Sequence, residues 1–322
     1  METILVTGAS GFVGGAVARR LADDGYTVRA HRNRRAPTFT HPQVTWVQAD
    51  LTDPSSAKAL TDGADGVVHC AAHTAGAAVM TSTPLAHVNP NVFMNAGLLA
   101  AAHESGVGRF LFVSSGAAYP DLGDGPLAED DMFLGDPPDV YFPVGWMKRY
   151  SEVLCRTYAE KITPAMPTVI VRPSNVYGPG DKFDFGKSHV TAALIRRVIE
   201  RHDPMTVWGD GKDERDLIFV DDFVDGLVAA FMHPARHLVV NIASGTTVSV
   251  RGILETAMDI DGFDAAVTYD ESKPRTIRAR QFSTERAAGL LGFRALTPLR
   301  EGIARTIDWY RAEGRLLVAD AA

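Results

Sequence analysis

The chain is short of cysteine, of long apolar runs and of positive charge. Cys70 and Cys155 are the only cysteines among 322 residues. They lie too far apart for a metal motif and are too few for a disulfide framework, so we expect no metal. No apolar run approaches the roughly 18 residues that span a bilayer, and no signal-peptide pattern precedes the apolar residues 4–6. We therefore expect a cytoplasmic protein without a membrane segment.

The formal net charge of −7 argues against binding to nucleic acid, because such binding requires a basic face. Hydrophobic residues make up 46% of the chain and charged residues 22%, which is typical of a folded globular protein. A chain of 322 residues has room for one large core or two smaller ones, so one or two domains are expected.

Short apolar segments alternate with helical patterns through the first half of the chain. A helix is expected over residues 14–25, and strands over residues 3–7, 27–30, 44–48, 66–70, 109–114 and 168–172. Strands that alternate with helices predict a parallel sheet with right-handed crossovers. The predicted fold class is α/β, with a Rossmann-type doubly wound parallel sheet in a dinucleotide-binding domain over residues 1–173.

The composition changes beyond residue 173, and a smaller mixed lobe is expected over residues 174–322. Segments rich in Gly, Pro and Asp predict loops at residues 173–184 and 206–216. Helical patterns interrupt them at residues 190–201 and 221–231. The apolar residues 239–242 should rejoin the main sheet, within a returning segment at about 214–243. Ligands of open α/β sheets bind beyond the carboxyl ends of the strands, so the lobe should cover that edge.

A glycine-rich turn, residues 7–14, follows the first expected strand. Gly8 permits a tight turn, Gly11 lets the backbone approach a pyrophosphate, and Gly14 allows the helix to pack closely on the strand. The free N–H groups and the positive end of the helix dipole then face the phosphates. An ordinary glycine turn is the alternative, which the βαβ context disfavours. The predicted dinucleotide contacts in this turn are Gly8, Ser10, Gly11, Phe12, Val13 and Gly14.

The residues after the second strand predict NADP as the cofactor, with NAD the less favoured choice. Residues 30–35 read AHRNRR, which contains three arginines and no carboxylate for a ribose 2′-hydroxyl. A guanidinium donates two hydrogen bonds to a 2′-phosphate, whereas a carboxylate repels it. We expect Arg32 to make this contact, and a solvated basic loop is the alternative. Asp50 is placed to accept a hydrogen bond from the adenine amino group.

With these features the chain resembles the extended short-chain dehydrogenase/reductase family of NAD(P)-dependent nucleotide-sugar epimerases and dehydratases. Ordered matches run along nearly the whole chain: HCAA at 69–72, Asn91, Ser114-Ser115, RPSNVYGP at 172–179, RDLIFVDD at 215–222, Gly302-Ile303 and Trp309-Tyr310. The resemblance implies a nucleotide-sugar substrate and cofactor contacts at Leu51, Ala71 and Lys148. It also implies a homodimer through a helix bundle that includes the helix of Lys148.

Within this family, one stretch is most similar to the GDP-fucose synthases, which are NADPH-dependent epimerase/reductases of a 4-keto-6-deoxy sugar nucleotide. The matching residues are Ser188-His189-Val190, ALIRR at 193–197 and VWG at 207–209. The resemblance implies that His189 is the acid and also contacts substrate. The cysteine that this group uses in epimerisation is replaced by Ala117.

The family's catalytic Tyr-x-x-x-Lys pair is incomplete in this chain. Lys148 matches the lysine and Ser115 matches the hydroxyl residue, but Val144 stands at the tyrosine position. A spacing of four residues puts both side chains on one helical face. In the family the lysine holds the nicotinamide ribose, and its charge favours the tyrosinate. Valine has no proton to give.

Three accounts of Val144 are open. In the first, His189 is the acid, since imidazole titrates in the right range. The alternative for His189 is a surface or core histidine without a catalytic role. In the second account, Tyr141 reaches the site from the loop that precedes the helix. Pro143 fits the first turn of that helix. In the third account hydride transfer has been lost, because removing a general acid typically costs about 10²–10⁴-fold in rate. The presence of Lys148 and Ser115 weighs against simple decay.

The resemblance also assigns residues to the nucleotide sugar. Arg215 matches a diphosphate-binding arginine, a role suited to bidentate pairing, and Asn175 matches a substrate-contacting asparagine. Trp208 is a candidate to flank the base, with an apolar contact inside the lobe as the alternative. Arg278 and Arg280 lie near another phosphate-contacting region of the family.

The predicted function is an NADP-dependent oxidoreductase or epimerase that reduces or epimerises a 4-keto-6-deoxy sugar nucleotide. A non-catalytic NADP- or nucleotide-sugar-binding protein and an atypical dehydratase or lyase are the alternatives. The fold alone does not separate them.

Overall fold

A seven-stranded parallel sheet forms the larger part of the computed structural model, which describes residues 2–74, 83, 85–123, 125–185, 188–272 and 277–314. The strand order is β11-β7-β5-β4-β1-β2-β3, and every neighbouring pair is parallel. The strands are β1 (Thr3–Thr7), β2 (Thr27–Arg32), β3 (Val44–Gln48), β4 (Gly66–His69), β5 (Arg109–Val113), β7 (Thr168–Pro173) and β11 (His237–Ile242). The predicted α/β class with a Rossmann-type sheet is confirmed.

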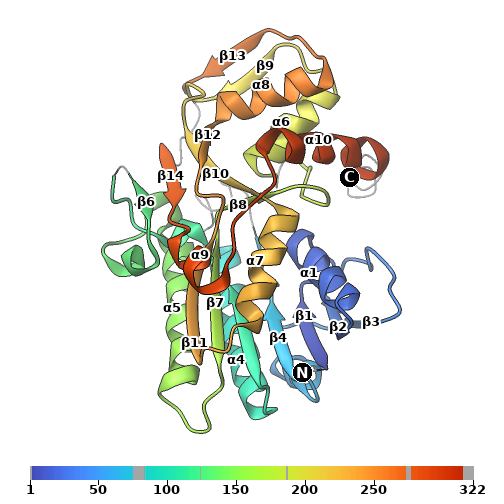
Figure 1. Cartoon of the computed structure of the whole chain (residues 1–322), viewed down its shortest axis with the longest axis vertical. Coiled ribbons are helices and arrows are strands. Elements are labelled where there is room, and N and C mark those ends of the chain that lie inside the picture. Colours follow the sequence, from blue (N-terminus) through green and yellow to red (C-terminus); the bar gives the residue numbers. More distant parts are fainter. Residues whose placement is uncertain are drawn as a thin grey trace.

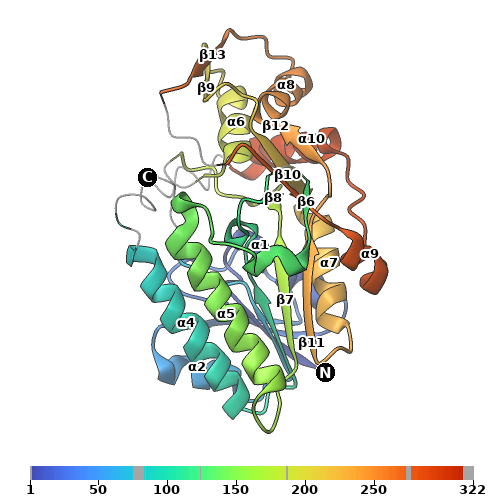
Figure 2. The ribbon, with the colours of Figure 1, turned by 90° about the vertical axis from the view of Figure 1, so that its left-hand side faces the viewer.

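Helices cover both faces of this sheet, which explains why its strands are nearly continuous apolar runs. The helices α2 (Pro54–Thr61), α4 (Leu85–Glu104) and α5 (Phe142–Glu160) pack on one face, while α1 (Phe12–Asp23) and α7 (Val220–Met232) pack on the other. Figure 2 shows α4 and α5 side by side, with α7 across the sheet from them. In β1 the side chains alternate accordingly: Leu5 joins the α4 side of the core, and Ile4 and Val6 join the α1 side.

A smaller lobe lies beyond the carboxyl ends of the main strands and occupies the top of Figure 1. Its strands are β6 (Pro126–Leu127), β8 (Asn175–Tyr177), β9 (Met205–Trp208), β10 (Glu214–Phe219), β12 (Thr247–Ser249), β13 (Val267–Asp270) and β14 (Ala279–Phe282). Five of them form one sheet in the order β12-β10-β14-β6 with β8 beside β10, and β13 pairs with β9. The α-helices beside them are α6 (Val190–Ile199), α8 (Val250–Asp261) and α10 (Leu299–Trp309), whereas α9 (Glu285–Leu291) lies against α7 and β11 of the larger part.

Four short helical segments complete the described elements. They are η1 (Gly116–Ala118), η2 (Glu129–Phe133), η3 (Asp139–Tyr141) and η4 (Tyr310–Gly314). None of the helices in the described ranges has the length and apolar character needed to cross a bilayer.

The predicted strands over residues 3–7 and 44–48 have the same bounds as β1 and β3, while the element ends that differ do so by one or two residues. The first helix starts at Phe12 because Gly11 is its N-cap. The loop predictions at residues 173–184 and 206–216 were wrong in part, since those ranges contain β8, most of β9 and the start of β10. These short strands pair with partners far along the chain, which a local composition argument does not detect.

The returning segment at about 214–243 divides between the two parts of the molecule. Its last strand, β11, pairs in parallel with β7 in the main sheet, and α7 packs on that sheet. Its first strand, β10, belongs to the five-stranded sheet of the smaller lobe. The domain boundary near residue 173 stays a prediction.

Candidate functional site

The glycine-rich turn between β1 and α1 has a backbone path that excludes side chains. Gly8 has a φ of +69°, and a Cβ added there would lie 2.7 Å from the Ala71 Cα. A Cβ on Gly14 would lie 2.3 Å from the Gly8 carbonyl oxygen. Gly11 caps α1 without any side-chain hydrogen bond, so the first N–H groups of the helix remain available to a ligand. This cradle fits the pyrophosphate of a dinucleotide.

His31, near the end of β2, holds this turn in place by a hydrogen bond. Its Nδ1 accepts a hydrogen bond from the Gly8 N–H at 3.1 Å, and its Nε2 lies 3.1 Å from the Ala49 carbonyl oxygen. These partners require the neutral tautomer with its proton on Nε2. Burial lowers the pKa of His31 and favours that neutral form. In the sequence His31 stands in a basic segment, and its anchoring role was not predicted because only tertiary contacts define it.

The predicted adenosine side of the site lies next to this anchor. Arg32 ends β2 and is half-buried, and its carbonyl accepts a hydrogen bond from the Ala49 N–H. Leu51 is buried, whereas the Asp50 carboxylate is exposed and accepts two hydrogen bonds from Thr52. These bonds lower the pKa of Asp50, with a smaller contribution from the charge of Arg34. The structure thus places Arg32 and Asp50 on neighbouring strand ends beside the glycine turn.

A buried polar chain fixes the floor of the site. The Ala71 N–H donates to Thr7 Oγ1 at 3.2 Å, and this hydroxyl lies 2.7 Å from His69 Nδ1. His69 Nε2 lies 2.9 Å from Asn95 Oδ1, and Asn95 Nδ2 donates to Ser151 Oγ at 3.0 Å. Burial lowers the pKa of His69 to about 3, so the ring stays neutral. This series of hydrogen bonds connects β1, β4, α4 and α5, and it holds Ala71 against the glycine-rich turn.

Lys148 lies at the carboxyl end of β5. Its Nζ donates to the carbonyl oxygen of Val113 at 2.9 Å and lies 4.7 Å from the centroid of the Phe112 ring. Burial lowers the pKa of Lys148 to about 8, an effect that Glu152 and Cys70 partly offset.

Two other residues of the predicted catalytic set lie on the segments that flank α5. Ser115 Oγ accepts a hydrogen bond from the Ala117 N–H at 3.1 Å and caps η1. Tyr141 is the N-cap of α5, outside its first turn as expected. Val144, one helical turn before Lys148, is half-buried and contributes no polar atom.

The residues around Ser115 are supported by a buried ion pair. Glu152 Oε1 accepts from Arg172 Nε at 3.0 Å and also from Ser114 Oγ, while Oε2 accepts from Arg172 Nη2 at 2.6 Å. Arg172 Nη1 donates to the Tyr119 hydroxyl at 2.9 Å, which itself donates to Asn241 Oδ1 at 2.7 Å. Burial raises the pKa of Tyr119. Its hydroxyl is therefore engaged on both sides and is a poor proton donor.

Arg280 reaches from β14 in the smaller lobe to the segment after Ser115. Its Nη1 donates to the Gly116 carbonyl at 2.7 Å and its Nη2 to the Tyr119 carbonyl at 3.3 Å. Burial lowers the pKa of Arg280 to about 10, which the nearby Tyr141 partly offsets. Arg278, just before β14, is exposed. Arg280 thus supports a backbone segment, a contact that the sequence did not indicate.

The predicted substrate residues lie on several elements of the smaller lobe. Asn175 and Arg215 lie on the paired strands β8 and β10, and Asn175 Nδ2 donates to the Asp216 carbonyl at 3.1 Å. Arg215 is half-buried and donates to the Ile277 carbonyl at 2.8 Å. Trp208 ends β9 and is 54% exposed, which disfavours the alternative of an apolar lobe contact.

His189 caps α6 at its N-terminus and is exposed as a residue, although desolvation of the ring, with the charge of Lys182, lowers its pKa. Within the described residues no hydrogen bond joins His189 to Ser115 or to Lys148.

Asp181, after β8, is a buried carboxyl group that the sequence analysis missed. Its Oδ1 accepts from the Lys182 N–H at 2.6 Å, and its Oδ2 has no hydrogen-bond partner in the described parts of the chain. Burial raises the pKa of Asp181 to about 7. Gly180 lies against Phe12, so this loop reaches the glycine-rich turn.

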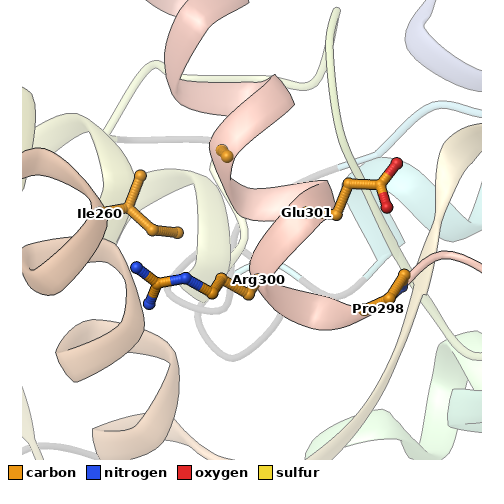
Figure 3. Close-up of a pocket in the computed structure, with 5 residues that line it drawn as sticks. Ile260, Pro298, Arg300 and Glu301 are labelled. Carbon is orange, nitrogen blue, oxygen red and sulfur yellow. The ribbon is translucent and has the colours of Figure 1, made fainter.

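A shallow, open hollow of about 480 Å³ lies elsewhere, between α8 and α10 (Figure 3). It is lined by Ile260, Pro298, Arg300, Glu301 and Ala304, none of which is a predicted site residue. In the described ranges, no group of three His, Cys, Asp or Glu side chains is arranged to hold a metal ion.

The chain is similar in sequence to known proteins over nearly its whole length. The chain is 28% identical over 316 residues to GDP-L-fucose synthase from Sinorhizobium fredii, covering 95% of each protein. It is 29% identical over 325 residues to dTDP-4-dehydro-6-deoxy-D-allose reductase from Streptomyces, covering 98% of each.

Solved structures of nucleotide-sugar epimerases and of MoeE5 are also similar to this chain. UDP-glucose 4-epimerase from Thermotoga maritima with UDP-glucose matches with a TM-score of 0.87 and 25% identity, over 96% of this chain and 99% of that one. MoeE5 in complex with UDP-glucose and NAD matches with a TM-score of 0.85 and 27% identity, over 97% and 99%. The model of the NAD dependent epimerase/dehydratase family matches residues 4–243. The chain therefore belongs to the NAD dependent epimerase/dehydratase family.

Proposed function

We propose that this chain is an NADP-dependent enzyme that reduces or epimerises a nucleotide-activated sugar of the 4-keto-6-deoxy class. One observation carries the proposal: the glycine-rich turn and Lys148 lie at the carboxyl edge of the same parallel sheet, under a lobe that presents Arg215 and Asn175. That edge is where open α/β sheets bind ligands. The relatives named GDP-L-fucose synthase and dTDP-4-dehydro-6-deoxy-D-allose reductase support the substrate class.

The choice of NADP rests on the end of β2. The strand ends at Arg32, and Arg34 and Arg35 lie within the next three residues. The segment 30–35 has no acidic residue to bind a ribose 2′-hydroxyl. The half-buried Arg32 is the best placed of the three to bind a 2′-phosphate, because less of its side chain remains to be ordered. Asp50 and Leu51 would face the adenine, and Gly8 to Gly14 with Ala71 would hold the pyrophosphate side.

The proposed catalytic groups act on the sugar carbonyl. When bound, the nicotinamide would supply hydride as NADPH or accept hydride as NADP⁺. Ser115 and Lys148 donate hydrogen bonds to the carbonyl oxygen and stabilise the negative charge that develops there. Lys148 also binds the nicotinamide ribose. His189 and Tyr141 are the candidate acids from the sequence, and Arg215 and Asn175 hold the nucleotide part of the substrate, with Trp208 beside the base.

A homodimer and a cytoplasmic location are further parts of this proposal. The apolar or aromatic side chains of Trp146, Tyr150 and Val153 are exposed along one face of α5, and Phe93 is exposed on the adjacent α4. Residues spaced three and four apart share a helical face, and an exposed apolar face of this kind marks an interaction site. Sedimentation velocity tests the dimer, which Tyr150→Glu should dissociate.

The alternative is a protein that binds NADP and a nucleotide sugar without turnover, and Val144 favours it. The test is to incubate the protein with NADPH and a panel of 4-keto-6-deoxy sugar nucleotides and to follow coenzyme oxidation and products. Turnover by the native chain supports the enzyme. Tight binding of both ligands without turnover, together with activity created by Val144→Tyr, would establish the binding protein instead.

A further inference from the structure

Lys148 stands at the place where the carboxyl ends of β4 and β5 meet α5. Its Nζ is bonded to the carbonyl of Val113, the last residue of β5, and lies over the Phe112 ring. Cys70, the residue after β4, lies near Lys148, because each of the two groups influences the pKa of the other. The ammonium group is therefore on the ligand-binding edge of the sheet, not on an outer helix face.

No carboxylate in the described residues forms an ion pair with this ammonium group. Glu152, one helical turn further on, accepts hydrogen bonds from Arg172 with both oxygens and a third from Ser114. An ammonium group has three N–H donors, and the Val113 carbonyl uses one. Two N–H groups of Lys148 therefore remain for ligands.

We infer that Lys148 is itself the proton donor to the substrate oxygen, in the place of the tyrosine that Val144 replaces. This inference rests on the proposed reductase function. In the reductive direction the keto carbon receives hydride from the bound reduced nicotinamide and forms a new C–H bond. The electron pair of the C=O π bond moves to oxygen, which takes a proton from Lys148 Nζ. The neutral amine then regains a proton from water.

Three other polar groups near this edge are poorer donors. Tyr119 is buried, with its hydroxyl held between Arg172 and Asn241. Burial raises the pKa of the Cys70 thiol to about 12. The Ser115 hydroxyl does not ionise near neutral pH. It can therefore only relay a proton or polarise the substrate carbonyl.

The electrostatic surroundings make Lys148 a suitable acid. Burial lowers its pKa to about 8, and a general acid is most efficient when its pKa is near the working pH. His69 and Cys70 face it from β4, and Glu152 faces it from its own helix. His69 is neutral above about pH 3, and Glu152 is balanced by Arg172. One titration, that of Lys148, should therefore govern the pH dependence.

The first test measures the titration directly, without turnover. Trace acetylation of the folded protein between pH 6 and 11, read by mass spectrometry, reports the fraction of neutral amine at Lys148. The expected midpoint is near 8, the value to which its pKa is lowered. A midpoint at the ordinary lysine value of 10.5 would contradict the inference.

The second test follows single-turnover hydride transfer from NADPH to the substrate found by the panel. Lys148→Arg keeps the positive charge but holds its proton at every accessible pH, so the rate should fall by roughly 10²–10⁴-fold while NADPH still binds. Lys148→Gln, which fits the same space without charge, should lose the rate equally. Lys161→Arg, an exposed lysine at the end of α5, is the matched control and should keep the native rate.

The pH dependence of the hydride-transfer rate distinguishes Lys148 from His189 as the acid. The native rate should decline above a pH near 8, and His189→Ala should keep that limb, because it belongs to Lys148. Native turnover that persists in folded Lys148→Arg, or a limb that disappears in His189→Ala, overturns the inference alone. No NADPH oxidation by the native chain with any substrate overturns the proposed function, and the inference with it.

Discussion

The glycine-rich turn and the smaller lobe hold their functional groups in different ways. In the turn, Gly8 and Gly14 have no room for a Cβ. The neutral imidazole of His31 is hydrogen-bonded to the backbone of Gly8, and that of His69 is hydrogen-bonded to the side chain of Thr7. In the lobe, Asn175, Trp208 and His189 are exposed. The cofactor side is thus rigid before any ligand binds, whereas the substrate side presents side chains to solvent. Substitutions in the turn should therefore disrupt binding and folding together, and substitutions in the lobe should change binding alone.

The largest effect is expected from Gly14→Ala. The added methyl group would lie 2.3 Å from the Gly8 carbonyl oxygen, which is backbone and has no other position to move to without opening the turn. NADPH binding, measured by fluorescence titration, should be abolished, and the melting temperature should fall. Gly289→Ala, in α9 with nothing within 4 Å of the new Cβ, is the control and should bind NADPH normally. Native-like NADPH affinity in Gly14→Ala would contradict a preformed cradle.

The next effect concerns the ion pair beneath Ser115. Glu152→Ala leaves the buried Arg172 guanidinium without a carboxylate, and such a loss costs about 3–5 kcal/mol of unfolding free energy. Urea denaturation measures it. Glu160→Ala breaks the largely exposed pair with Arg156 on the same helix and should change stability by less than about 0.5 kcal/mol. Equal effects of the two substitutions would show that this half of the molecule is not held by its buried network.

The buried imidazole of His69 gives a pH dependence of stability. Its pKa in the folded protein is lowered to about 3, so the unfolded chain, with an ordinary pKa of 6.5, binds the proton more readily. The contribution of His69 to stability is complete above pH 6.5 and should decrease as the pH falls towards about 3. Urea titrations at several pH values should show this slope, and His69→Asn should reduce it. An unchanged slope in that variant would mean that another group is responsible.

The smallest effect is expected at the arginines after β2. Arg32→Ala removes one charged donor to the 2′-phosphate, and such hydrogen bonds contribute about 1.5–3 kcal/mol, or roughly 10–100-fold in affinity. Calorimetric titration should show weaker NADPH binding. NADH, which has no 2′-phosphate, is the internal control and should bind the variant as it binds the native chain. A parallel loss for both cofactors would assign Arg32 to the fold of the turn.

The sequence predicted the regular part of the molecule well because that part follows local rules. Periodicity located β1 and β3 exactly, and the glycine spacing located the turn between β1 and α1. The place of Tyr141 outside the helix followed from Pro143 in the first turn, whereas the assignment of Lys148 came from the family resemblance.

What the sequence could not show depends on contacts between distant residues. The anchoring of the turn by His31, the engagement of Tyr119 with Arg172 and Asn241, and the reach of Arg280 into the segment after Ser115 are of this kind. The strands β8, β9 and β10 were expected to be loops in part, because they are short and their partners lie far along the chain.

The most direct test of the account is a crystal structure of this protein with NADP. The account predicts the pyrophosphate over the N-terminus of α1, the 2′-phosphate on Arg32, and the nicotinamide ribose within hydrogen-bond distance of Lys148 Nζ. A structure in which the coenzyme lies elsewhere, or with the glycine-rich turn closed to it at saturating concentration, would contradict the account.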